Sequence, residues 1–208
     1  ASVKARKHEI MLLHDKLRRY DLILASGSPR RRQLLKDAGL TFEVAPYFET
    51  DESFADDMPA DGVAEYLSRK KSECYSSEIK KDEIVITADT TVIAEGNVLG
   101  KPVSVEHASD MLRLLSGKWH TVITGVTIRT CCRTHSFSVS TRVKFKKLTD
   151  EEISYYIEKY SPMDKAGSYG IQEWIGYIGI EAIDGSYYNV VGLPIQRLCT
   201  ELDNMLKE

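Results

Sequence analysis

One segment close to the start of the chain combines residue types that bind anions. The segment Ser26–Arg32 reads SGSPRRR and directly follows the apolar run 22–24. That run predicts a buried strand, and Pro29 predicts the first helical position, where its missing N–H does no harm. The free N–H groups of a helix N-terminus, together with hydroxyl and guanidinium groups, suit a phosphate chain. The alternative is a water-exposed arginine cluster that simply follows a strand.

Carboxylates occur at two separate places that could serve one site. Asp89 is the only charged residue of the segment 84–91. An unpaired buried carboxylate is costly, so Asp89 is expected at a strand end as a metal ligand or general base, unless it only caps a turn. Asp51 and Glu52 belong to the acidic segment 47–61 and could complete an oxygen-ligand site for Mg²⁺ or Mn²⁺. The alternative for this segment is an acidic loop exposed to water.

Two further positions offer groups for a nucleotide. Lys101 stands between Gly100 and Pro102, and this restrained backbone would direct its ammonium group at a phosphate. Gln172 ends the glycine-rich segment 164–172, and its amide presents one donor and one acceptor, the complement of uracil or thymine. An ordinary turn lysine and an ordinary glycine-rich turn are the alternatives.

The hydrophobic pattern predicts the elements that must position these groups. Strand and helix periods alternate along the chain, which favours an α/β fold. A hairpin turn is predicted at Asp184-Gly185. Helices are predicted over 1–20, 29–38, 62–79, 104–116, 149–160 and from 194 onward, and strands over 22–24, 40–44, 83–94, 98–99, 121–130 and 135–146.

Composition excludes several classes of protein. The 208 residues carry a net charge of −3, which argues against broad electrostatic capture of nucleic acid. The four cysteines form no CxxC pair, which indicates reduced thiols rather than a disulfide framework or a zinc site. No stretch resembles a membrane span or a signal-peptide core, so we expect a cytoplasmic protein with no membrane partner.

Taken in order, the motifs resemble those of the Maf family of nucleoside triphosphate pyrophosphatases. The resemblance covers nearly everything from Leu22 onward. The matching motifs are SGSPRR at 26–31, DE at 51–52, Lys71, ADTTV at 88–92, GKP at 100–102, LSG at 115–117, DKAGSYGIQ at 164–172 and VVGLP at 190–194.

The resemblance implies one elongated α/β domain over residues 21–208, preceded by a helical extension over 1–20. Its architecture would be a long curved mixed sheet flanked by helices, with a deep cleft, similar to the inosine triphosphate pyrophosphatases. Members of the family hydrolyse the bond between the α- and β-phosphates and release pyrophosphate. Arg30, Lys71 and Gln172 match the branch that prefers dTTP and UTP over 7-methyl-GTP. A homodimer is also implied.

The resemblance also assigns roles within the expected site. Glu52 and Asp89 would hold a divalent cation (Mg²⁺, Mn²⁺ or Co²⁺), and Asp89 would take the proton of the attacking water. Lys101 would act beside these two in catalysis. The substrate-binding residues would be Ser26, Arg30, Arg31, Lys71, Thr90 and Gln172, with Arg31 supporting Arg30.

Some assignments stay open at this level. Lys70 and Lys71 are adjacent, so a shift of one residue would exchange the site lysine for a surface lysine. Asp51 could share metal binding with Glu52. Arg32 is expected in water, whereas Trp174 and Tyr177 are expected in the core rather than stacked on a base.

The competing function is a nucleotide-sensing or nucleic-acid-binding regulator of cell division without catalysis. Such a protein would not need both acidic positions together with several separated cations. A kinase is disfavoured because the sequence contains no GxxxxGK[ST] motif. We expect a nucleoside triphosphate as the partner and no stable complex with nucleic acid.

Overall fold

The computed structural model describes residues 11–75 and 78–207. None of the helices in these ranges has the length and apolar character needed to cross a lipid bilayer. The helices are α1 (Leu13–Leu17), α2 (Pro29–Asp37), α3 (Val63–Cys74), α4 (Val105–Leu115), α5 (Asp150–Tyr160), α6 (Trp174–Gly179), α7 (Tyr187–Val191) and α8 (Ile195–Met205). The strands are β1 (Asp21–Leu24), β2 (Glu43–Val44), β3 (Glu83–Ala94), β4 (Asn97–Leu99), β5 (Trp119–Arg129), β6 (Thr134–Phe145) and β7 (Ile180–Asp184).

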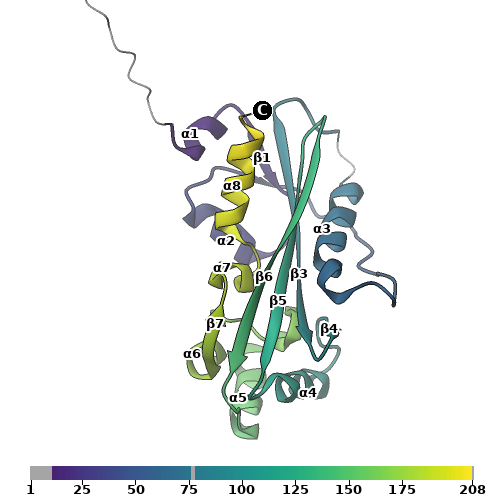
Figure 1. Cartoon of the computed structure of the whole chain (residues 1–208), viewed down its shortest axis with the longest axis vertical. Coiled ribbons are helices and arrows are strands. Elements are labelled where there is room, and N and C mark those ends of the chain that lie inside the picture. The colour runs from purple at the N-terminus through teal and green to yellow at the C-terminus, as the bar shows by residue number, and fades with distance from the viewer. Residues whose placement is uncertain (1–10, 76–77, 208) are drawn as a thin grey trace, which may run out of the picture.

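All of these strands join one mixed sheet, which confirms the predicted α/β class. Its order is β2-β1-β3-β5-β6-β7, with β4 on the edge of β3. Strand β1 runs parallel to β2 and β3, and the other pairs are antiparallel. The long strands β3, β5 and β6 follow the longest axis of the molecule (Figure 1), so the sheet is elongated as expected.

Strand β3 has an open edge in the middle of the sheet. Its pairing with β1 ends at Ile86, and its pairing with β4 begins only at Val92. Within the described part of the chain, no strand covers the segment 87–91 on that side. The carboxyl end of β1 and the start of α2 face this gap, which is the usual place for a ligand in a sheet with parallel strands.

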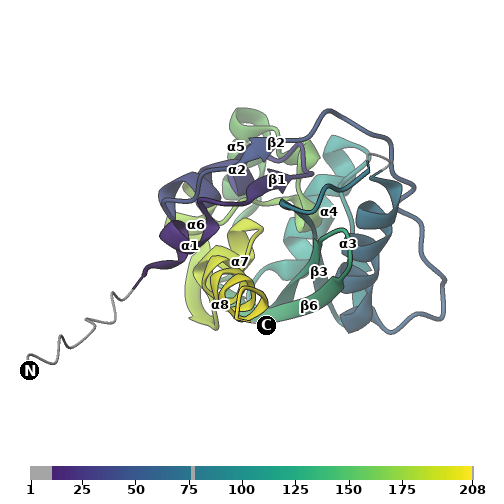
Figure 2. The same cartoon turned by 90° about the horizontal axis from the view of Figure 1, so that it is seen from above.

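Helices cover both faces of the sheet. Helix α3 packs against β3 and β5 on one face, while α2 and α8 lie on the other (Figure 1 and Figure 2). The apolar core accordingly joins buried residues of α2, α8, β1 and β3 in one cluster and of α4, α5, β5 and β6 in another. At Gly125 of β5, an added Cβ would overlap the backbone of Ala64 and Glu65, so α3 touches the strand backbone directly.

Several predicted boundaries were wrong. The helix predicted over 62–79 ends at Cys74, because Tyr75 adopts an extended conformation. The strand predicted over 40–44 is reduced to Glu43–Val44. Of the helical extension predicted over 1–20, residues 1–10 lie outside the described ranges, and within 11–20 the α-helix is confined to Leu13–Leu17.

The hairpin predicted at Asp184-Gly185 was also wrong. Strand β7 ends at Asp184 and is followed by helix α7 instead of a second strand. Gly185, with φ of +127°, reverses the chain direction. The Ser186 hydroxyl then accepts a hydrogen bond from the Asn189 N–H at 3.3 Å and caps the helix.

Candidate active site

The predicted anion-binding turn joins β1 to α2. Pro29 occupies the first turn of the helix, and the Ser28 hydroxyl caps it by accepting a hydrogen bond from the Arg31 N–H at 3.4 Å. The Ser26 hydroxyl accepts the Ser28 N–H at 3.3 Å. The local reading of strand, turn and helix start is therefore confirmed.

The three arginines of this turn have different surroundings. Arg31 donates to the carbonyls of Gly192 and Ala88 at 2.8 and 2.9 Å. It also donates to the hydroxyls of Thr90 and Ser26 at 3.1 and 3.2 Å, so it fastens the turn to β3. Arg30 instead reaches Asp164 across the cleft, with Nη1 3.2 Å from Oδ2. Arg32 is exposed and donates to the carbonyl of Gly27.

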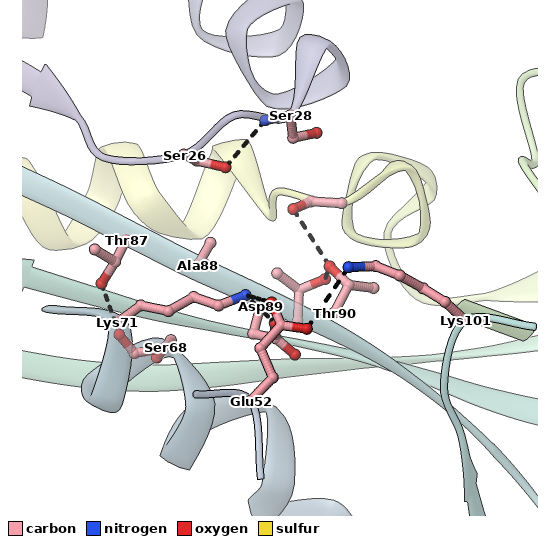
Figure 3. Close-up of polar contacts among 12 residues, drawn as sticks. Ser26, Ser28, Glu52, Ser68, Lys71, Thr87, Ala88, Asp89, Thr90 and Lys101 are labelled. Atoms are coloured by element: carbon pink, nitrogen blue, oxygen red, sulfur yellow. Dashed lines mark hydrogen bonds and ion pairs between the residues drawn. The ribbon is translucent and has the colours of Figure 1, made fainter. Parts of the chain in front are cut away.

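Four charged side chains gather at the open edge of β3, and we call this cluster the phosphate end of the cleft. Lys71 Nζ lies 2.5 Å from Asp89 Oδ1 and 2.8 Å from Glu52 Oε1. Lys101 Nζ lies 3.6 Å from Glu52 Oε2. Figure 3 shows the two lysines approaching Glu52 from opposite sides. Residues 12 to 49 positions apart in the sequence thus form one charge cluster.

The pKa of Glu52 reflects these two lysines. Partial burial acts to raise the pKa of the Glu52 carboxyl, but hydrogen bonds and charges from Lys71 and Lys101 outweigh it and lower the pKa below its ordinary value. Glu52 is therefore an ionised carboxylate at neutral pH. Together with Asp89, it presents hard oxygen donors to a cation in the cleft.

The structure resolves the ambiguity between the two adjacent lysines. Lys71 points from α3 to Asp89, whereas Lys70 contacts Asp51 at 2.7 Å on the exposed side of the helix. The hydrogen bond from Lys70, with those from Ser53, lowers the pKa of Asp51. Asp51 is therefore engaged away from Asp89, and Glu52 alone supplies the carboxylate of this pair to the cleft.

The glycine-rich segment 164–172 lines the cleft with Lys165 and Gln172, and we call these two residues, together with Tyr156 and Glu173 behind them, the base end. The Gln172 Oε1 atom is buried and lacks a hydrogen-bond partner among the described residues. Other buried side-chain atoms share this condition, but only Gln172 belongs to a residue that lines the cleft. A buried acceptor without a donor is costly, so this oxygen points to a donor on a ligand.

One cleft of about 420 Å³ contains every residue that was predicted for the site. Sequence reasoning missed Tyr156 and Glu173, which have no local motif to mark them. Tyr177 was wrongly expected in the core: it is 83% exposed. Trp174 is partly buried and packs edge-on against the ring of Tyr155. The cleft residues are Ser26, Arg30, Arg31, Glu52, Lys71, Asp89, Thr90, Lys101 and Gln172.

Glu52 and Asp89 are too few ligands to hold a metal ion by themselves, so phosphate oxygens of a substrate would complete its coordination. No group of three or more His, Cys, Asp or Glu side chains that could hold a metal occurs among the described residues. Glu52 and Asp89 nevertheless converge on one cation, the ammonium of Lys71. Mg²⁺ is commonly bound by one or two carboxylates together with phosphate oxygens of a substrate, so this pair fits such an ion.

Comparisons with known proteins agree with the motifs. A protein named dTTP/UTP pyrophosphatase from Bacteroides thetaiotaomicron is 49% identical over 189 residues, covering 91% of this chain and 98% of that protein. A protein of the same name from Parabacteroides distasonis is 51% identical over 188 residues, covering 90% and 97%.

Solved structures were also compared. A HAM1 protein from Coxiella burnetii superposes with a TM-score of 0.45 at 14% identity, covering 89% of this chain and 99% of that one. The model of the family described as Maf-like protein matches residues 21–205. The chain belongs to the Maf-like protein family.

Proposed function

We propose that this protein is a nucleoside triphosphate pyrophosphatase that converts dTTP and UTP to the monophosphate and pyrophosphate. Relatives of this name match almost the whole chain. The observation that supports the chemistry is the cluster of Glu52, Lys71, Asp89 and Lys101 opposite a helix N-terminus. We infer that residues 21–208 form the catalytic domain and that residues 1–20 are an extension of it.

The side chains divide the work of hydrolysis between binding and proton transfer. The turn at Ser26 and the side chain of Arg30 bind phosphate oxygens, while Lys71 and Lys101 offset the remaining charge. Water attacks the α-phosphorus, and a carboxylate oxygen of Asp89 accepts its proton. The bond to the bridging oxygen breaks, and pyrophosphate leaves.

A divalent cation completes this proposal. Glu52 and Asp89 would hold Mg²⁺, Mn²⁺ or Co²⁺. When bound, such an ion neutralises phosphate charge and stabilises the leaving group. The Lys71 ammonium lies between the same carboxylates, so it holds them close together before substrate arrives. The expected cytoplasmic location and homodimer stay predictions.

Gln172 supports the choice of a pyrimidine. Its buried amide oxygen is free to accept the N3–H of thymine or uracil, and an amide can donate to a neighbouring base carbonyl. Cytosine carries no proton on N3, and would therefore leave the oxygen without a donor. A site that hydrogen-bonds one base strongly disfavours an analogue lacking that group.

The test is a panel of nucleoside triphosphates with Mg²⁺, Mn²⁺ or Co²⁺, with pyrophosphate release as the readout. We expect release from dTTP and UTP and little from dCTP, dATP or dGTP. Release from purines alone would contradict the base assignment. Binding of dTTP with no release under any of the three metals would favour the nucleotide-sensing regulator.

A further inference from the structure

A continuous chain of polar contacts runs from the anion-binding turn to the base end. It begins at Arg30, whose Nη1 lies 3.2 Å from Asp164 Oδ2. The other oxygen of Asp164 lies 2.8 Å from Lys165 Nζ, which also lies 3.2 Å from Glu173 Oε1. Lys165 thus links the carboxylate of Asp164, which lines the cleft, to that of Glu173 behind it.

Beyond Lys165, the chain continues to the backbone beside Gln172. The hydroxyl of Tyr156 donates to Glu173 Oε2. The same hydroxyl accepts the Gly170 N–H at 3.0 Å. In addition, the Glu173 N–H donates to the Gly170 carbonyl at 3.0 Å. The residues on both sides of Gln172 are therefore fixed by hydrogen bonds.

The contacts that join Lys165, Glu173 and Tyr156 are buried, which makes them expensive to break, whereas the side chain of Asp164 is 62% exposed. The side chain of Lys165 is 9% exposed, that of Glu173 is 21% exposed, and Tyr156 is fully buried. Burial and the hydrogen bond to Glu173 raise the pKa of Tyr156, so its hydroxyl keeps its proton and remains a donor. Buried groups that are fully satisfied hold a rigid geometry.

Gln172 needs this rigidity because its amide oxygen is the recognition group. The oxygen accepts no hydrogen bond from the described residues, so no polar partner holds it in place. Its position therefore depends on the backbone between Gly170 and Glu173. A displacement of that backbone would move the oxygen relative to the base without touching the charges at the phosphate end.

We propose that Tyr156, Lys165 and Glu173 are positioning residues for base selection, which hold Gln172 so that its free oxygen meets the base. This inference rests on the proposed function, because it assigns a device for the selectivity of the same cleft. None of the three acts on the reacting phosphorus. The network is a selectivity element that connects to the anion-binding turn through Asp164 and Arg30.

The decisive variant is Tyr156→Phe, which removes one oxygen and keeps the ring in the core. The Gly170 N–H then loses its acceptor and Glu173 loses a donor. We expect the KM for dTTP to rise about tenfold, the size of effect expected when a buried polar group loses its partner, while kcat changes less than about twofold. The ratio of kcat/KM for dTTP over dGTP should fall by a similar factor.

The matched control is Tyr160→Phe. Tyr160 lies on the same helix and stacks on Tyr156 with ring centroids 5.2 Å apart, but no hydrogen bond of its hydroxyl occurs among the described contacts. We expect its kinetics to equal those of the unmodified protein. Glu173→Gln keeps an acceptor for the Tyr156 hydroxyl and should preserve most of the selectivity, whereas Glu173→Ala should lose it.

The outcomes separate this inference from the proposed function. An equal loss of kcat for every nucleotide in Tyr156→Phe, with an unchanged dTTP/dGTP ratio, would show a general structural role and overturn the positioning role. If the unmodified protein releases no pyrophosphate, the proposed function fails, and equilibrium binding of dTTP and dGTP then tests the network alone. If Tyr156→Phe does not fold, the comparison of Glu173→Gln with Glu173→Ala decides.

Discussion

At the phosphate end of the cleft, two of the four charged side chains are open to water: Glu52 is 47% exposed and Lys101 is 58% exposed. At the base end, Lys165 and Glu173 are only 9% and 21% exposed. Exposed ion pairs contribute little stability and exchange partners readily, whereas buried pairs are costly to break. The phosphate end can therefore give its charges to a substrate, while the base end keeps its shape.

The comparison shows two kinds of ion pair in one molecule. Exposed pairs can exchange their partner for a substrate, and buried pairs hold the local structure rigid. Lys71 and Asp89 are as shielded as the base-end pair, at 16% and 13% exposure. This partial shielding strengthens their interaction and still leaves them in contact with the cleft. The phosphate end therefore combines one shielded ion pair with two exposed charges, which suits a site that must bind a changing charge distribution.

The largest expected effect is a loss of stability at the base end. Lys165→Met removes the buried cation and leaves Glu173 without its ion-pair partner, which should lower the free energy of unfolding by roughly 3–5 kcal/mol. Lys101→Met, at the phosphate end, should lower it by less than about 1 kcal/mol. Urea unfolding measures both. Equal losses in the two variants would remove the distinction between the ends.

The acid side of the stability profile tests the base end in a second way. His120 lies beneath it, with Nε2 2.6 Å from the Tyr169 hydroxyl, and burial lowers the pKa of His120 from 6.5 to about 4. As the pH falls below 6.5, His120 becomes protonated in the unfolded chain but stays neutral in the folded protein, so acid favours unfolding. The free energy of unfolding has its full value from this group above about pH 6.5, and about 3 kcal/mol of it is lost as the pH approaches 4.

The variant His120→Gln isolates this contribution, because glutamine can still hydrogen-bond to the Tyr169 hydroxyl but does not titrate. Its free energy of unfolding should decline less steeply between pH 6.5 and pH 4 than that of the unmodified protein. Urea titrations across this range give the two slopes. Parallel slopes would mean that other groups produce the acid sensitivity.

At the phosphate end, Asp89→Asn should leave the fold intact and lower turnover at least ~100-fold, as expected when a proton-accepting group is removed. Asn keeps the shape of the side chain, so the melting temperature should change little. Asp51→Asn is the matched control, because Asp51 contacts Lys70 outside the cleft. Pyrophosphate release is the readout. Near-normal turnover in Asp89→Asn would reject its assignment as the base.

The smallest of these effects comes from the adjacent lysines. Lys71→Met removes the cation shared by Asp89 and Glu52 and should lower kcat/KM for dTTP about 30-fold, close to 2 kcal/mol, as expected for a charged hydrogen bond. Lys70→Met removes only an exposed contact and should change kcat/KM by no more than about twofold. A larger effect from Lys70 would reverse the orientation assigned to α3.

Features with a local cause could be predicted from the sequence. The turn at Ser26–Arg32 was found because a strand end, hydroxyl residues and Pro29 are neighbours in the chain. The long strands were recognisable from their apolar and β-branched content. The ordered motifs placed Glu52, Asp89 and Gln172 in one predicted site, and all three line the same cleft.

Features that depend on the relative placement of distant elements could not be predicted. Whether Lys70 or Lys71 faces Asp89 depends on the rotation of α3 against the sheet, which packing decides. The hydroxyl of Tyr156 meets Glu173 only because α5 docks behind the glycine-rich segment. The open edge of β3 follows from where β1 ends and β4 begins, which no single segment encodes.

Gly125 shows how this placement reaches the reacting groups. It stands directly opposite Asp89 in the register of β3 and β5, and it is the position where α3 touches the sheet. Lys71 lies seven residues, about two turns, beyond Ala64 on that helix. Because Gly125 carries only a hydrogen atom, α3 packs close enough to the sheet for Lys71 to reach the Asp89 carboxylate. A methyl group at this position would push α3 away from the sheet and increase the distance between Lys71 and Asp89.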